Sequence, residues 1–456
     1  MDEYVSRRGV LEGIGAAVSV VPISSVDRAE RSFDAVVDVS AVGGDTSGGA
    51  AVDDVITDVA RDGTLLEFPD GRYRIDDLTL TDLEGVGLSA AGDVTLVPGT
   101  ACENWLTVAE VEDFLFEGFT LDNTASGCAP TVVMRASDGL EVRDVTKRGY
   151  HDGDNTAFGF AVTDATGTGV VERLRVPDGS IPVKPVGVYV QGEGTITFRD
   201  CHIEGFGNNG LYASMAGGPV HVEGGRYVDN DRANVRLGSP NSSVRRADIV
   251  ARAADPMPLN ARGIRFSDGP GPVLIEDCHI HMAGGRGMGG IVNAYNGGTL
   301  EVRDTVIRID PEYRNLRGTH TGYGVLLDEA SAAPTGTRTL ENVRVVGGGS
   351  GGAALRVRRG DTTLRDCCIR QTGDRDGLRF ELDPSDVTVV DIAIDVPGRR
   401  VTGSADLDFE RASGECTGDD PSSGSGESRK DETREDETRD GEIPDPGGTL
   451  PTNWIC

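Results

Sequence analysis

The feature that most constrains this 456-residue chain is an internal repeat of short, strand-like segments. The run ITFRDCHI (196–203) returns in altered form as VLIEDCHI (273–280) and TTLRDCCI (362–369). After a glycine-rich turn, each is followed by a run of glycine, apolar residue, any residue, apolar residue. Such alternation over short runs predicts strands rather than helices. Units of this kind predict an all-β solenoid in which each coil packs on its neighbours. The second run occurs at 187–190, 210–213, 263–266, 324–327 and 377–380.

A column of alternating charge predicts how these repeats stack. With the repeats aligned, the position two residues before the shared cysteine position alternates between glutamate and arginine, although the coils range from 22 to 38 residues. In a parallel β-helix, equivalent residues of successive coils lie about 4.8 Å apart, where opposite charges attract and like charges repel. The alternation predicts these vertical neighbours: Glu117, Arg143, Glu172, Arg199, Glu223, Arg245, Glu276, Arg303, Glu341 and Arg365.

The two positions after this charged one predict a sharp bend and an inward column. Eight of the ten residues at the first position are Gly, Asp or Asn, which tolerate left-handed backbone. The second position includes Cys201, Cys278 and Cys367, which lie three coils apart, or about 14 Å, too far for a disulfide. We therefore expect buried thiols there. The remaining candidate disulfides are Cys102 with Cys128, and Cys416 with Cys456.

The start of the repeat resembles the N-terminal cap of the pectin-lyase-like superfamily. The resemblance rests on VVDVSAVGGD (36–45), on GTLLEFPDGRYRI (63–75), and on a predicted helix between them with one apolar face. It covers roughly residues 35–400 and implies a right-handed parallel β-helix of about 12 coils, with the helix covering the first coil. It also implies a working surface along one parallel sheet and the loops that enter it. The apolar face of the helix consists of Val52, Val55, Ile56 and Val59.

The two ends of the chain differ from the repeat. Residues 1–30 contain SRRGVL (6–11) before a short apolar stretch, which resembles a twin-arginine export signal and is too short for a membrane span. The β-helix is expected over 31–410. The segment 411–456 is rich in Ser, Asp, Glu and Gly, which predicts disorder. We therefore expect an extracellular protein with no segment inserted in a membrane.

The charge balance restricts the partners. Acidic residues outnumber basic ones by 75 to 44, the net charge is −31, and only three of the basic residues are lysines. Nucleic acid is excluded as a partner, because its phosphates would be repelled. Carboxylate-rich, lysine-poor surfaces resemble those of proteins from extreme halophiles, where salt screens the self-repulsion. A merely acidic mesophilic protein is the alternative.

The predicted working face lies on the strands that begin with glycine. Tyr189 and Tyr212 are expected to bind sugar rings, and the guanidinium groups of Arg236 and Arg265 to bind carboxylates or sulfates. An ordinary packed face is the alternative. In successive coils the outward residues of these strands are aligned as Ala161, Tyr189, Tyr212, Arg236, Arg265, Val292, Leu326, Arg356 and Arg379.

Two long loops, 146–157 and 177–185, are expected to bring further polar residues to this face. The resemblance implies two chemistries. Lyases of the family use calcium-binding acids with an arginine or lysine base, and hydrolases use paired carboxylates. The candidate catalytic residues are Asp152, Asp154, Asp229, Asp231, Arg236 and Arg265. The candidate substrate-binding residues are Tyr189, Tyr212, His151, Lys184 and Asn209, and the candidate calcium ligands are Asp152 and Asp154.

The function predicted from these patterns is recognition of a polysaccharide by a secreted protein. A lyase or glycoside hydrolase that acts on an acidic glycan is the first hypothesis. A non-catalytic, glycan-binding surface or adhesion protein is the alternative, because the hydrolase motifs of the family are missing and no lyase signature is present. A purely structural solenoid is a third possibility. The sequence leaves the choice between them and the oligomeric state open.

Overall fold

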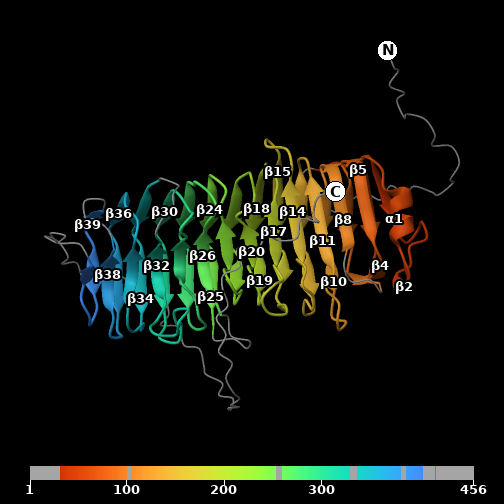
Figure 1. The fold of residues 1–456 in the computed structure, drawn as a ribbon. Helices are drawn as coiled ribbons and strands as arrows, with labels where there is room; N and C mark the ends of the chain where they lie inside the picture. Colours follow the sequence, from red (N-terminus) through yellow and green to blue (C-terminus); the bar gives the residue numbers. More distant parts are fainter. Residues whose placement is uncertain are drawn as a thin grey trace. The chain divides into compact units, whose positions relative to one another are not determined.

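The structure is a computed structural model and describes residues 31–99, 104–252, 259–328, 336–381, 387–403 and 416. They form a right-handed parallel β-helix in which each full coil contributes one strand to each of three parallel sheets (Figure 1). Two sheets have 14 strands and the third has 13. The predicted fold class and the predicted number of about a dozen coils are confirmed. Within the described ranges, no helix is long and apolar enough to cross a membrane.

We name the sheets A, B and C in the order in which each coil visits them. Sheet A consists of β1 (Ala35–Asp38), β3 (Thr64–Phe68), β6 (Gly87–Ala90), β9 (Leu115–Glu117), β12 (Leu140–Arg143), β15 (Thr168–Glu172), β18 (Thr195–Arg199), β21 (Val220–Glu223), β24 (Ser242–Arg245), β27 (Val273–Glu276), β30 (Leu300–Arg303), β33 (Arg338–Glu341), β36 (Thr362–Arg365) and β39 (Val387–Val390).

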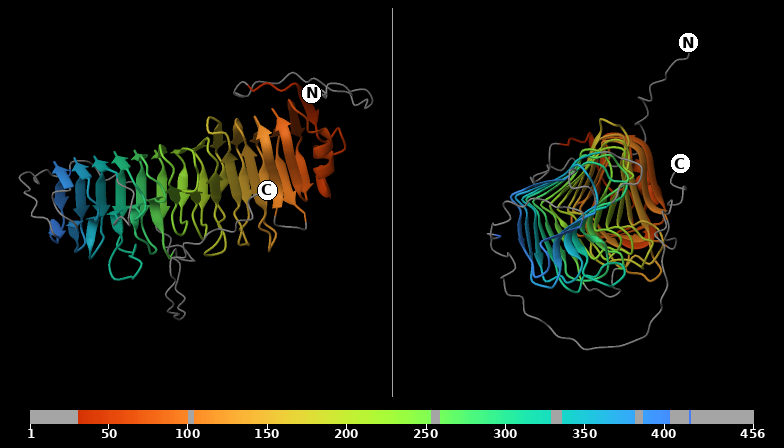
Figure 2. Two further views of the ribbon diagram at one scale, coloured as in Figure 1. Left: turned by 45° about the horizontal axis from the view of Figure 1, so that its top comes forward. Right: turned by 60° about the vertical axis from the view of Figure 1, so that its left-hand side comes forward.

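Sheets B and C follow the same stacking order along the axis of the β-helix (Figure 2). Sheet B consists of β2 (Ser47–Ala51), β4 (Gly71–Ile75), β7 (Val94–Pro98), β10 (Thr120–Asp122), β13 (Thr146–Arg148), β16 (Arg175–Val176), β19 (His202–Glu204), β22 (Arg226–Val228), β25 (Asp248–Ala251), β28 (His279–Met282), β31 (Val306–Ile309), β34 (Arg344–Gly347), β37 (Cys368–Gln371) and β40 (Ala393–Asp395). Sheet C consists of β5 (Leu78–Glu84), β8 (Asn104–Glu112), β11 (Thr131–Ala136), β14 (Phe158–Val162), β17 (Val188–Gln191), β20 (Leu211–Ala213), β23 (Val235–Leu237), β26 (Arg262–Phe266), β29 (Gly289–Asn293), β32 (Tyr323–Leu327), β35 (Ala353–Val357), β38 (Asp376–Phe380) and β41 (Val401–Gly403).

The alternating charges of sheet A stack as the sequence predicts. From Glu117 to Arg365, every glutamate is the register partner of the arginine in the next coil. Arg199 Nε lies 3.2 Å from Glu223 Oε2, and the ion pair of Arg245 with Glu276 measures 3.0 Å. We call this column the charge ladder.

The residue after each member of the charge ladder makes the predicted bend. All ten of these residues have positive φ angles, including Arg173 (52°) and Arg246 (53°), which are the two that are not Gly, Asp or Asn. The chain then turns inward, so that Cys201, Cys278 and Cys367 are buried and free of disulfides, as expected. The bend therefore sets the boundary between sheets A and B in each of these coils.

The N-terminal cap also forms as predicted. Helix α1 (Asp53–Val59) covers the first coil, and Val52 and Ile56 are fully buried against the core. One prediction about the C-terminal end is wrong: Cys416 forms a disulfide with Cys368 of β37, not with Cys456. Cys128 is disulfide-bonded, but Cys102 lies outside the described residues, so their pairing stays a prediction, as does disorder of the tail.

Candidate functional site

The outward column of sheet C forms largely in the predicted register. Tyr189 pairs with Tyr212, Tyr212 with Arg236 and Arg236 with Arg265, and the column continues to Arg379. Ala161 is an error in the alignment, because Gly159 is the partner of Tyr189 and Ala161 is that of Gln191. A shift of two residues keeps every side chain on the same face of the sheet. The apolar pattern of the sequence therefore could not reveal the misalignment of Ala161.

Four neighbouring side chains of this column form what we call the Tyr–Arg stripe: Tyr189, Tyr212, Arg236 and Arg265. The rings of Tyr189 and Tyr212 meet edge to face, with centroids 5.3 Å apart. The Arg236 guanidinium lies over the Tyr212 ring, 4.5 Å from its centroid. Neighbours along the column therefore cover much of the Tyr212 ring faces. Of the four side chains, Tyr212 and Arg236 remain partly exposed, whereas Tyr189 and Arg265 are buried.

A carboxylate that the sequence analysis did not nominate holds this stripe in place. Asp268, in the turn after β26, forms an ion pair with Arg236 and accepts hydrogen bonds from Ser267 Oγ (2.7 Å) and Asn296 Nδ2 (2.6 Å). Burial alone would raise the pKa of Asp268, but the charge of Arg236 and these hydrogen bonds outweigh it and lower the pKa to about 2. Asp268 is therefore a fixed negative charge beside the stripe at neutral pH.

Apolar side chains that face solvent gather along the two edges of sheet C. The described residues include seven large hydrophobic side chains that are exposed, and six of them lie in loops that lead into or out of sheet C strands. These loops join sheet B to sheet C or sheet C to sheet A, so the exposed apolar side chains lie along both edges of sheet C. Tyr150, Val183, Leu259 and Leu316 precede sheet C strands, Met215 and Tyr295 follow them, and Val390 of sheet A is the exception.

His151, which was predicted to bind substrate, is buried in the corner between sheets B and C. Its side chain is 0% exposed, and Nε2 lies 3.1 Å from the Asn155 carbonyl oxygen. Burial lowers the pKa of His151 to about 4, with a further contribution from the charge of Lys147. His151 is therefore neutral at pH 7 and acts as part of the core, so the predicted contact with substrate is wrong.

Lys147 explains part of this environment. The sequence predicts a loop at this position, but Lys147 lies in β13, faces inward next to Leu121, and is 2% exposed. Its ammonium group donates a 2.6 Å hydrogen bond to the Gly149 carbonyl oxygen. Burial lowers the pKa of Lys147 to about 8, although the charge of Asp178 opposes this.

The nominated acids of the first loop point to separate partners. Asp152 accepts a 3.2 Å hydrogen bond from the Gly127 N–H, while Asp154 pairs with Lys184 at the surface. No group of three His, Cys, Asp or Glu side chains suited to a metal ion occurs among the residues that the structure describes. Calcium at Asp152 and Asp154 stays a prediction, and it would require Lys184 to release Asp154.

The second nominated pair of acids is also occupied by contacts within the protein. Asp229 is 7% exposed and forms an ion pair with Arg252. Asp231 accepts a 2.7 Å hydrogen bond from the Asn260 N–H, and Asn209 is 1% exposed. These side chains close loops between coils, so they support no pairing of a general acid with a general base. Loop contacts of this kind depend on unequal coil lengths, which the strand repeat does not encode.

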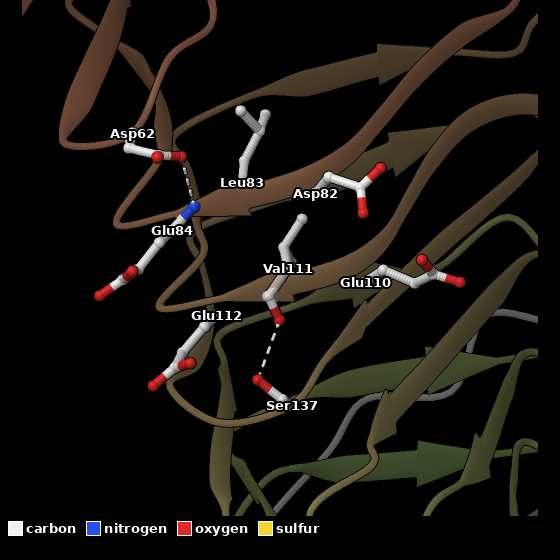
Figure 3. A pocket seen from close by; sticks show the side chains of 8 residues that line it. All are labelled: Asp62, Asp82, Leu83, Glu84, Glu110, Val111, Glu112 and Ser137. Atoms are coloured by element: carbon white, nitrogen blue, oxygen red, sulfur yellow. Dashed lines mark hydrogen bonds between the residues drawn. The ribbon is translucent and has the colours of Figure 1, made fainter. Parts of the chain in front are cut away.

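A different part of sheet C forms an acidic groove of about 400 Å³ (Figure 3). It lies where β5, β8 and β11 end, and five carboxylate side chains line it. Such a groove would repel an anionic ligand, in contrast to the Tyr–Arg stripe. The lining residues are Asp62, Asp82, Leu83, Glu84, Glu110, Val111, Glu112 and Ser137.

Comparisons with known proteins agree on the fold. A family described as right-handed β-helix region matches residues 184–369. The structure of PfbA, a surface adhesin of Streptococcus pneumoniae, shares 12% identity and covers 81% of this chain and 94% of its own, with a TM-score of 0.51. A search of curated proteins found no match.

Two enzyme structures resemble the chain more distantly. The A-module of mannuronan C-5 epimerase AlgE4 from Azotobacter vinelandii has 16% identity and a TM-score of 0.40, with 81% of this chain and 100% of that chain covered. An exopolygalacturonase from Thermotoga maritima has 11% identity and a TM-score of 0.42, with 81% and 93% covered. With TM-scores below 0.5, neither similarity carries an argument about the fold or the activity of this chain.

Proposed function

We propose that this chain is an exported protein that binds an acidic polysaccharide along sheet C. The observation that carries the proposal is the gathering of six exposed apolar side chains at the edges of that sheet. They flank the Tyr–Arg stripe, in which Tyr212 and Arg236 are partly exposed. Sugar rings pack on apolar and aromatic surface, and guanidinium groups bind carboxylates and sulfates.

The acidic surface determines the conditions in which this binding works. With a net charge of −31, the protein repels an anionic polymer at long range, and molar salt screens this repulsion. The halophilic composition and the twin-arginine segment in residues 1–30, which lie outside the described residues, fit a protein that acts outside the cell in brine. Apolar contacts strengthen in salt while exposed ion pairs weaken, so the flanking residues carry most of the affinity in this proposal.

The test uses Val390 as its control, because among the described residues it is the exposed large hydrophobic side chain that lies outside the loops bordering sheet C. Tyr295→Ser should weaken binding of pectate, alginate or sulfated oligosaccharide in molar salt by about tenfold, as expected for loss of an aromatic contact. Val390→Ser removes an exposed apolar side chain from sheet A and should leave affinity unchanged. Isothermal titration calorimetry measures both. Equal affinities for the two variants and the wild type, or no binding to any of these glycans, would overturn the proposal.

Cleavage of the same glycan is the second candidate function, and Asp268 is the observation that favours it. It is a carboxylate that touches the Tyr–Arg stripe through Arg236, and its low pKa keeps it ionised at neutral pH, as a carboxylate nucleophile must be. Product analysis with and without calcium, for the wild type and Asp268→Asn, separates the candidates. New reducing or unsaturated ends that disappear in Asp268→Asn support cleavage, whereas retained binding without product supports an adhesion role.

A further inference from the structure

Beyond the Tyr–Arg stripe, the outward column of sheet C becomes accessible again in the C-terminal coils. Val292 and Leu326 are 1% and 2% exposed, so they form a covered interval between the two parts. The column then reaches Arg356 of β35 and Arg379 of β38, which are register partners. Together with Arg358, Tyr323 and Glu381, these residues form what we call the arginine cluster.

The cluster converges on one carboxylate. Glu381 lies 2.7 Å from Arg356 Nη2, 2.8 Å from Arg379 Nε and 3.1 Å from Arg358 Nε. Arg358 also forms a 2.9 Å ion pair with Asp328. Glu381 therefore serves as a shared counterion for three arginines, in a chain whose net charge is −31.

The stacking of Arg356 on Arg379 contrasts with the charge ladder. In the charge ladder, each arginine from Arg143 to Arg303 has a glutamate above and below it, whereas here two arginines occupy adjacent strands and share one counterion. Like charges directly opposite each other destabilise a sheet. A second anion between them would relieve this repulsion. Glu381 already accepts from Nε and Nη2 of Arg356, so such an anion would meet Nη1 of Arg356 and the terminal nitrogens of Arg379.

Tyr323 provides a further donor at this place. Its hydroxyl oxygen accepts a 3.2 Å hydrogen bond from Arg356 Nη1, which leaves the hydroxyl hydrogen to donate elsewhere. The His320 ring packs against Tyr323 edge to face, with centroids 5.6 Å apart, and helps to hold the phenol in position. The side chain of Arg379 is 50% exposed, so an anion can reach the cluster from solvent.

We propose that the arginine cluster is an oxyanion-binding site that takes a carboxylate or sulfate group between Arg356 and Arg379, with the Tyr323 hydroxyl as an additional donor. Glu381 stays in place as the fixed counterion of the three arginines. The site lies three coils, or about 14 Å, from Arg265 and does not depend on glycan binding at the Tyr–Arg stripe.

Inorganic sulfate and a sulfated oligosaccharide, added separately at constant ionic strength, test this site. For the wild type, we expect saturable binding of sulfate by calorimetry and affinity about tenfold weaker in Arg379→Gln, because one charge-assisted contact is lost. Arg399→Gln is the matched control, since Arg399 is also an exposed arginine of these coils but pairs with Asp376 outside the cluster. Arg379→Lys keeps the charge without the planar fork and should bind with intermediate affinity.

The two ligands distinguish the source of the anion. Binding of inorganic sulfate that depends on Arg379 supports a site for a free ion. Binding that depends on Arg379 only with the sulfated oligosaccharide supports a site for a charged group on a polymer. If neither ligand distinguishes Arg379→Gln from Arg399→Gln, or if neither binds the wild type, the proposal is wrong.

Discussion

Sheets A and C each carry an outward column through the same coils, but the two columns follow different rules. On sheet A, glutamate and arginine alternate without a break from Glu117 to Arg365. On sheet C, tyrosine follows tyrosine, arginine follows arginine, and the compensating acids Asp268 and Glu381 come from outside the column.

Under the proposed function, the column of sheet A serves stability and that of sheet C serves binding. A column selected for stacking alone should resemble the charge ladder, because alternation satisfies every neighbour at once. The column of sheet C departs from this alternation in two places, at the Tyr–Arg stripe and at the arginine cluster. Exposed apolar residues flank the same sheet. Departures from local consistency that other contacts compensate are typical of functional sites.

The largest expected effect comes from destroying the alternation in sheet A. The double variant Arg199→Glu and Arg245→Glu would place five glutamates in successive coils, from Glu172 to Glu276. Since four attractive contacts become repulsive, we expect a loss of about 2–4 kcal/mol of unfolding free energy at low salt and less in molar salt. Urea unfolding at both salt concentrations measures this. A loss that does not depend on salt would contradict the electrostatic explanation.

Next in size is the effect of replacing the buried Lys147, which tests whether the interior needs a charge. Lys147→Met continues the inward apolar column and should raise the unfolding free energy by about 1–3 kcal/mol at pH 7, since a buried charge is removed. Wild-type stability should also rise from about pH 8 to 10.5, because the folded lysine loses its proton near 8 and the unfolded one near 10.5. The variant should lack this rise, and Lys184→Met at the surface should change neither quantity.

The smallest of the three effects is expected for Asp268→Asn, which should lower the stability of the protein and strengthen its binding of an acidic ligand. Asp268→Asn removes the counterion of Arg236, so we expect a loss of about 1–2 kcal/mol of unfolding free energy at pH 7. Because the pKa of Asp268 is about 2 when folded and 3.8 when unfolded, the difference should disappear as the pH falls from about 4 to 2. An acidic oligosaccharide should bind Asp268→Asn several-fold more tightly, since one negative charge leaves the stripe. Weaker binding would indicate that Asp268 itself contacts the ligand.

The strand repeat encoded the fold because each coil passes the same three corners. The charge ladder and the left-handed bend mark one corner in ten coils, so the register of sheet A could be predicted from the sequence. The same logic placed Tyr189, Tyr212, Arg236 and Arg265 in one column. It failed at Ala161, where a shift of two residues leaves the apolar pattern unchanged.

The loops could not be predicted in the same way. The alignment says which strand a loop joins but not which backbone groups its side chains meet, so Asp229 and His151 were taken for surface groups although both are buried. Asp268 was missed because it lies in a turn, beyond the aligned strand. Glu381 carried a usable signal: it follows Arg379 by two residues, and strand residues at that spacing share a face.

Hydrogen–deuterium exchange with and without a saturating acidic oligosaccharide, in molar salt, tests most directly whether sheet C is the binding face. We expect slower exchange in the turns that leave sheet C at 214–217, 267–270 and 294–297, and no change in the bends that follow the charge ladder on sheet A. Slower exchange confined to sheet A, with the sheet C turns unaffected, would contradict the assignment.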